Sequence, residues 1–381
     1  MTGAPFGDFY RGRRVLVTGD SGFKGAWLCQ WLSLLGAHAR GFGLAPPTSP
    51  SLHDEAGLAD LVPARRGDIR DTGALRAALE WAEPEVVFHL AAQPLVLRSY
   101  REPAETFDVN VMGTVRLLEA CDRAGGVRAV VVVTSDKCYA DAGARAHTES
   151  DPLGGADPYS ASKAAAELVV AAWRNTHAAH GPRLATARAG NVIGGGDWSD
   201  DRIVADLARA AASGSAAVLR HPSAVRPWQH VVEPLAGYLL LGARLTLDGA
   251  PFDRAWNFGP DPGTARTVHE LAAAFAARWA HHTGAEPPPA ALAEGAGAPG
   301  ERATLSIDSA AAAARLGWRP VLSFDDAVDL TAGWYARWAT QRPFDARAAM
   351  AEQIEHYQAR AASAPEPVAH HPVTHLVPAP T

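Results

Sequence analysis

Residues 13–25 read Arg-Arg-Val-Leu-Val-Thr-Gly-Asp-Ser-Gly-Phe-Lys-Gly. A short apolar run here ends in a glycine-rich turn, which is typical of a β-strand leading into a tight loop. Large apolar side chains then recur at helical spacing, at Phe23, Trp27, Leu28, Trp31, Leu32 and Leu35. The stretch therefore predicts a strand, a tight turn and a helix, the opening unit of an α/β fold.

Apolar runs and helical patterns continue to alternate along the next part of the chain. Strands are predicted at 37–44, ending at 67–68, at 86–90, 129–134 and 184–188, and helices at 71–81, 110–124 and 158–180. Strands that alternate with helices form parallel sheets covered on both faces. We therefore predict an α/β fold, a doubly wound parallel Rossmann sheet followed by a smaller α/β lobe, because the alternation breaks down after about residue 190.

The pattern divides the chain into four parts. We expect an N-terminal extension (1–12), a dinucleotide-binding Rossmann domain that also carries the catalytic residues (13–190), a mainly substrate-binding lobe (191–345) and a C-terminal extension (346–381). Residues 363–381 are rich in proline and histidine and predict a disordered end. Its histidines and the earlier His356 are more typical of a solvated tail than of a metal site.

Composition narrows the class of protein. The chain has 381 residues, a formal net charge of −6 and three scattered cysteines. No dense run of Lys or Arg predicts nucleic-acid binding, and no stretch of about 18 apolar residues predicts a membrane span. Too few cysteines are present for a disulfide framework, which favours the cytoplasm. A small-molecule ligand is therefore expected, with no metal.

The glycine-rich turn is the first candidate binding site. Gly19, Gly22 and Gly25 follow the first strand, and Phe23 and Lys24 open the helix, where free backbone N–H groups favour a pyrophosphate. Tight packing of helix on strand would explain the glycines as well. Four further cofactor contacts are expected, with adenine at Asp68 and Ile69 and the middle of the cofactor at Leu90, Ala91 and Ala92. Residues 41–47 hold no Arg or Lys for a 2′-phosphate, which favours NAD over NADP.

A second set of residues predicts hydride transfer. Tyr159 and Lys163 are four positions apart and share a helix face, so Lys163 is expected to bind the nicotinamide ribose and to lower the pKa of the Tyr159 phenol. Upstream, Ser135, Asp136 and Lys137 follow a strand at the edge of the sheet where ligands bind. An acid beside an amine is more acid–base equipment than alcohol oxidation needs, although Asp-Lys after a strand is often only a solvated turn.

Longer strings carry a resemblance to a known family. They read Val-Thr-Ser-Asp-Lys-Cys-Tyr at 133–139, Asp-Pro-Leu-Gly-Gly-Ala-Asp-Pro-Tyr-Ser-Ala-Ser-Lys at 151–163, Ala-Gly-Asn-Val-Ile-Gly-Gly-Gly-Asp-Trp at 189–198 and Arg-Pro-Trp-Gln-His-Val at 226–231. With 22–28 and 89–96, they make the chain resemble the CDP-glucose 4,6-dehydratases, which belong to the extended short-chain dehydrogenases/reductases of the NAD-dependent epimerase/dehydratase type. The resemblance covers residues 13–338.

The resemblance implies oxidation at carbon 4 of CDP-glucose, loss of water across carbons 5 and 6, and return of the hydride to carbon 6. Tyr159 would be the base of the first step, Ser135 would hold the 4-hydroxyl and Asp136 would protonate the departing 6-hydroxyl. Lys137 stands where related dTDP-glucose dehydratases place the Glu that removes the carbon 5 proton. Substrate contacts are expected at Gln93, Asn191, Arg202, Arg226, His230 and Glu301. Residues 299–302 depart from the His-Glu-Ala string common in the family.

Two other functions compete with this interpretation. A 4-epimerase, or a dehydratase for another nucleotide sugar, would use the same scaffold, but an epimerase needs no elimination pair. A non-catalytic dinucleotide sensor would not need Tyr159 and Lys163. The nucleotide base stays open. A homodimer formed through the helices at 110–124 and 158–180 is expected by resemblance.

Overall fold

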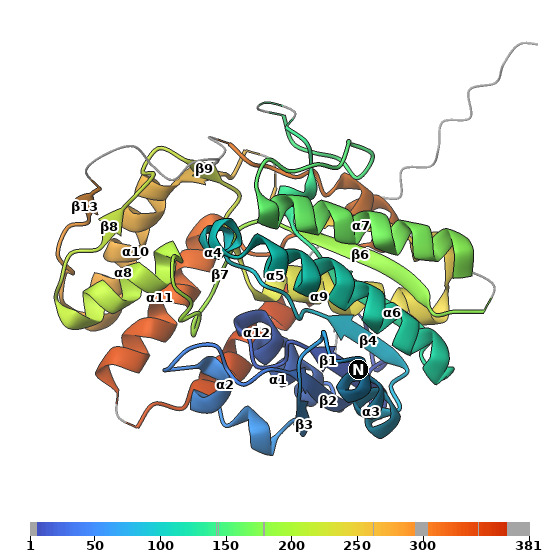
Figure 1. Cartoon of the computed structure of the whole chain (residues 1–381). Coiled ribbons are helices and arrows are strands. Elements are labelled where there is room, and N and C mark those ends of the chain that lie inside the picture. Colours follow the sequence, from blue (N-terminus) through green and yellow to red (C-terminus); the bar gives the residue numbers. More distant parts are fainter. Residues whose placement is uncertain are drawn as a thin grey trace, which may run out of the picture.

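The computed structural model describes residues 6–141, 143, 145–177, 180–261, 263–293, 304–341 and 343–363. Its centre is a seven-stranded sheet in the order β11-β6-β5-β4-β1-β2-β3, in which every pair of neighbours is parallel (Figure 1). The strands are β1 (Arg14–Thr18), β2 (His38–Gly43), β3 (Ala64–Arg66), β4 (Val86–His89), β5 (Ala129–Val133), β6 (Arg183–Ala189) and β11 (Ala255–Phe258). This confirms the predicted α/β class.

Apolar residues alternate between the two faces of the sheet. Val15 and Val17 of β1 point into one core, and Leu16 points into the other. The first core is covered by α1 (Phe23–Leu34) and α9 (Val232–Leu247), the second by α3 (Thr72–Ala82), α6 (Gly113–Ala124) and α7 (Pro158–His177). Both faces of the strands are therefore buried, as a parallel sheet requires.

Most predicted elements lie within a few residues of their expected bounds. The helix expected at 110–124 starts later, because a π-helical turn, η2 (Asp108–Met112), precedes α6. The helix expected to reach residue 180 ends at 177, and residues 178 and 179 lie outside the described ranges. Short helices fill the remaining connections, namely α2 (Leu52–Glu55), η1 (Leu58–Asp60), α4 (Val96–Arg101), α5 (Pro103–Phe107), η3 (Asp136–Cys138), η4 (Ala250–Phe252) and η5 (Ala312–Leu316).

The later half of the chain contributes to the sheet as well as to the second lobe. β11 pairs with β6, and α9 covers strands of the same sheet, although both follow residue 190. The lobe consists of α8 (Ile203–Ser213), α10 (Val268–Thr283) and α11 (Phe324–Thr340). Three two-stranded sheets complete it: β7 (Val192–Ile193) with β10 (Gln229–His230), β9 (Val225–Arg226) with β12 (Arg266–Thr267), and β8 (Val218–Leu219) with β13 (Ala291–Leu292).

The C-terminal extension begins as a packed helix, α12 (Ala346–Ser363). Its Tyr357 ring meets Trp31 of α1 edge-to-face at 5.7 Å, and its hydroxyl donates to buried Glu233 of α9 at 3.2 Å. The tail predicted to be disordered, with its histidines, lies outside the described residues from 364 onward. Of the helices in the described ranges, none combines the length and apolar character that a membrane span needs.

Candidate active site

The glycine-rich turn is closed by backbone contacts that leave no room for side chains. Gly19 has φ +74°, and a Cβ there would lie 2.7 Å from the Ala91 nitrogen. A Cβ at Gly25 would lie 2.0 Å from the Gly19 oxygen. Gly22 caps α1 without a side-chain hydrogen bond, and a Cβ at that position meets only one atom, at 3.5 Å. The free helix N-terminus fits the pyrophosphate of a dinucleotide.

The turn also carries a buried charge that the sequence did not single out. The Asp20 carboxylate, 2% exposed, accepts two hydrogen bonds from Arg66, at 3.1 and 2.8 Å. A Cβ at Gly41 would lie 2.4 Å from its Oδ2. Asp20 thus lies over the end of β2, where an acid for the adenosine ribose was sought, and the glycines at 41 and 43 were the signal for this close approach.

The other predicted cofactor residues lie around the edge of the sheet. Asp68 is bound by the guanidinium of Arg70 at 2.7 to 3.1 Å, a hydrogen bond that lowers the pKa of this carboxyl. Ile69 is buried, and its Cγ2 would lie 2.8 Å from a Cβ on Gly113. Residues 90–92 are half-buried just after β4.

Ser135, Asp136, Tyr159 and Lys163 come together at the carboxyl end of β5. The Ser135 hydroxyl donates to Asp136 Oδ1 at 2.9 Å and is also hydrogen-bonded to Tyr159. Asp136 Oδ2 is buried and has no hydrogen-bond partner among the described residues. Burial raises the pKa of Asp136 against the lowering effects of Lys137, Ser135 and nearby cations. Asp136 is therefore biased toward the protonated form, as a general acid must be.

The Tyr159–Lys163 pair differs in one respect from expectation. Burial raises the pKa of Tyr159 to about 12, and the groups that act to lower it are Ser135 and Arg202, not Lys163. The Lys163 ammonium instead donates to the Val133 carbonyl at 3.2 Å, and burial lowers its pKa to about 8. Desolvation therefore outweighs the expected influence of lysine on the phenol in the cofactor-free chain.

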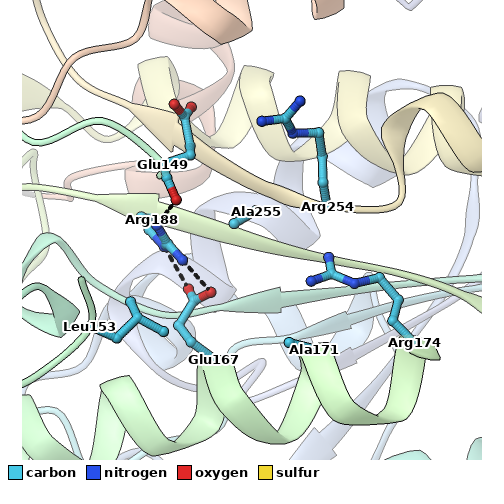
Figure 2. A pocket seen from close by; sticks show the side chains of 8 residues that line it. All are labelled: Glu149, Leu153, Glu167, Ala171, Arg174, Arg188, Arg254 and Ala255. Carbon is cyan, nitrogen blue, oxygen red and sulfur yellow. Dashed lines mark hydrogen bonds and ion pairs between the residues drawn. The ribbon is translucent and has the colours of Figure 1, made fainter. Parts of the chain in front are cut away.

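A buried ion pair supports this edge from behind. Glu167, one helical turn after Lys163, accepts from Arg188 at 2.9 and 2.7 Å and from the Thr134 hydroxyl at 2.5 Å. Figure 2 shows Arg188 above Glu167, beside a cavity of about 330 Å³. This cavity lies at the back of α7, whereas the orphaned oxygen of Asp136 marks the reactive side. Glu167 therefore fixes Thr134, the residue before Ser135.

The predicted substrate residues separate into two groups. Exposed Arg202 and buried Arg226 act electrostatically on Tyr159 and Asp136 respectively, which places both near the reactive groups. Half-buried Asn191 follows the β6 end, and its carbonyl accepts from Gln229 at 3.1 Å. These three residues border the site.

The remaining three are placed differently. The Gln93 side chain is buried and bonds to Leu95 and Thr106. His230 is 0% exposed and packs edge-to-face on Trp27 at 5.7 Å, and burial lowers its pKa to about 3. Glu301 lies outside the described residues.

Two residues extend the site beyond what the sequence predicted. Lys24, expected only at the cofactor, points toward Tyr238 of α9, with Nζ 5.9 Å from the ring centre. The charge of Lys24 and that of Asp136 act on each other. Tyr238 is buried, its hydroxyl has no hydrogen-bond partner among the described residues, and it interacts with Tyr159 and Asp136. No sequence pattern linked position 238 to the site.

A parallel sheet with a glycine-rich dinucleotide turn and a Tyr-x-x-x-Lys pair beside Ser135 defines a short-chain dehydrogenase/reductase. The sequence model of the family described as "NAD dependent epimerase/dehydratase family" matches residues 15–250. A CDP-glucose 4,6-dehydratase from Salmonella typhimurium is 43% identical over 338 residues, which cover 87% of this chain and 92% of the relative. The chain therefore belongs to the NAD-dependent epimerase/dehydratase family.

Solved structures agree with this assignment. The dTDP-glucose 4,6-dehydratase from Streptomyces venezuelae, solved with NAD bound, is 28% identical and aligns with a TM-score of 0.71 over 84% of this chain and 96% of that one. The UDP-glucose 4-epimerase of Thermus thermophilus, in complex with NAD, is 27% identical with a TM-score of 0.70, over 84% and 98% of the chains.

Proposed function

We propose that this protein is an NAD-dependent nucleotide-sugar 4,6-dehydratase whose substrate is CDP-glucose. The single observation that carries the proposal is the position of Asp136, a buried carboxyl whose raised pKa keeps it protonated beside Ser135 and Tyr159. An epimerase needs the tyrosine and the lysine, but no acid for a departing hydroxyl. The 43% identity to a CDP-glucose 4,6-dehydratase supports the cytidine nucleotide.

The residues of the chain divide the reaction between them. Tyr159 takes the proton of the 4-hydroxyl, which Ser135 orients, and Lys163 holds the ribose of the cofactor. Bound NAD accepts the hydride from carbon 4 and supplies it later to carbon 6. The carbonyl formed at carbon 4 acidifies the proton on carbon 5, and Asp136 then protonates the 6-hydroxyl as it leaves. Arg202 and Arg226 are the cations available for the diphosphate.

Mass spectrometry tests this function directly. Purified protein with catalytic NAD is incubated with CDP-glucose and, separately, with UDP-, dTDP- and GDP-sugars. We expect loss of one water from CDP-glucose without net formation of NADH. Loss of water from another sugar alone would move the nucleotide assignment, and epimerisation without loss of water would remove the role of Asp136. The variant Asp136→Asn, which cannot donate a carboxyl proton, should oxidise but not dehydrate.

A homodimer is the second part of the proposal. Large apolar side chains stay exposed on one group of neighbouring helices, α4 to α7, at Tyr100 (42%), Phe107 (38%), Met112 (43%) and Leu168 (60%) (Figure 1). A second copy of this chain would cover them with the same helices. Light scattering of the wild type and of Met112→Glu/Leu168→Glu should show a dimer and a monomer. A monomeric wild type would refute it. The cytoplasmic location stays a prediction.

A further inference from the structure

The elimination step needs a base as well as an acid, and the position of the acid limits where the base can be. Water is lost across carbons 5 and 6, so the group that takes the carbon 5 proton must work one bond away from the carbon on which Asp136 acts. This requirement rests on the proposed dehydratase function. Two lysines are close enough to Asp136 to affect its charge, Lys137 and Lys24.

Lys24 reaches Asp136 from the first turn of α1. The ring of the preceding residue, Phe23, lies 3.1 Å from where a Cβ of Gly194 would be, so the substrate loop after β6 packs directly on this turn. Lys24 is half-buried and forms no hydrogen bond or ion pair within the described ranges. It faces two further polar groups without partners there, the Tyr238 hydroxyl and Asp136 Oδ2.

The surroundings of Lys24 favour the neutral amine. Burial lowers its pKa to about 8, Arg202 and Lys163 lower it further, and Asp136 and Asp197 act against them. A lysine with an ordinary pKa near 10 would be almost fully protonated at neutral pH, whereas one near 8 is a usable base. Lys137, by contrast, exerts the strongest lowering effect of any single group on the pKa of Asp136, which is the action of a charged ammonium.

We propose that Lys24 is the base that removes the carbon 5 proton. The Lys24 amine takes this proton, the electrons of the C–H bond form the double bond between carbons 5 and 6, and the C6–O bond breaks. The hydroxyl leaves as water with the proton of Asp136. When the hydride returns to carbon 6, the Lys24 ammonium gives its proton back to carbon 5. The proton that Tyr159 took from the 4-hydroxyl restores Asp136, so the sum is loss of one water.

Two substitutions separate a base from a positive charge. Lys24→Met removes both the amine and the charge, whereas Lys24→Arg keeps the charge but does not deprotonate at working pH. Single turnovers with CDP-glucose are followed by absorbance at 340 nm, which reports oxidation at carbon 4, and by mass spectrometry, which reports loss of water. We expect both variants to oxidise the sugar and to lose water at least about 100-fold more slowly than wild type.

Three controls decide between the alternatives. The affinity for NAD, measured by titration of tryptophan fluorescence, should stay within about threefold in Lys24→Arg. In D2O, wild type should place deuterium at carbon 5 and Lys24→Arg should not. Loss of water at a wild-type rate in Lys24→Arg, or failure of that variant to bind NAD, would overturn the role of Lys24, as would a block at the same step in Lys137→Met alone. A wild type that leaves CDP-glucose unchanged refutes the dehydratase function itself.

Discussion

Replacing Glu167 by Gln tests the ion pair that supports the catalytic edge. Both partners are almost fully buried, with 4% of the Arg188 side chain and 3% of Glu167 exposed. Arg188 donates to both carboxylate oxygens, and the hydroxyls of Thr134 and Thr186 donate to the same two atoms. The carboxylate thus accepts four hydrogen bonds. Gln is nearly isosteric, but its amide group sets a donor against a donor of Arg188 whichever way it turns.

The expected loss follows from leaving one buried charge without its partner. Breaking a buried ion pair in this way costs about 3–5 kcal/mol, and Arg188 keeps only the Tyr139 hydroxyl at 2.7 Å and the Glu149 carbonyl at 3.5 Å. We therefore expect Glu167→Gln to lower the free energy of unfolding by about 3–5 kcal/mol. Thr134 loses its acceptor as well, so the turnover rate should fall.

Urea unfolding followed by tryptophan fluorescence measures the loss. The matched control is Glu352→Gln, which breaks the exposed pair of Glu352 with Arg337 on the protein surface and should change the stability by less than about 1 kcal/mol. The double variant Glu167→Gln/Arg188→Met removes the unpaired charge and should recover part of the loss. If Glu167→Gln were no less stable than the surface control, the pair would carry no stability, and its support of Thr134 would have to be abandoned.

Three further substitutions test the turn and the core. Burial raises the pKa of Glu233 to about 7, so its protonated form is favoured in the folded chain, and the stability that this brings is present below pH 4.5 and lost as pH rises to about 7; Glu233→Gln should flatten this decline, roughly 3 kcal/mol in urea titrations, and an unchanged pH slope would contradict it. Asp20→Asn leaves the Arg66 charge uncompensated over β2 and should raise the NADP-to-NAD affinity ratio at least about tenfold in fluorescence titrations; an unchanged ratio would place the adenosine ribose elsewhere. Gly25→Ala should abolish NAD binding because its Cβ would overlap a backbone oxygen, whereas Gly126→Ala, whose Cβ meets one atom at 4.0 Å, should bind normally.

Much of the Rossmann half could be predicted because its signals are local. The run at 14–18, the glycines and the helical pattern after Phe23 lie within about twenty residues of one another. The seventh strand, β11, could not be predicted in this way, because its four residues gain their place only by pairing with β6, some seventy positions earlier. Helix α12 is similar, since Tyr357 becomes a core residue only through Trp31 and Glu233.

The candidate site shows the same division. Tyr159 and Lys163 are one helical turn apart, and their side chains could be paired from spacing alone. The Asp20–Arg66 pair and the approach of Lys24 to Tyr238 join positions 46 and more than 200 residues apart, which no periodicity reports. His230 is the opposite case. It stands in a string that resembles a substrate loop, but its neighbour Trp27 surrounds it with apolar core.

An acid and a base that act on adjacent carbons must both be in their reactive forms at one pH. Burial opposes charge, so it raises the pKa of a carboxyl and lowers that of an amine. In the cavity beside β5 it therefore favours protonated Asp136 and neutral Lys24 together. Two carboxyls in the same place would both be driven toward the protonated form, and one would need a separate cation to stay ionised. A lysine base needs no such partner, and for that reason a chain that lacks the glutamate of its dTDP-glucose relatives still has a physically consistent elimination pair.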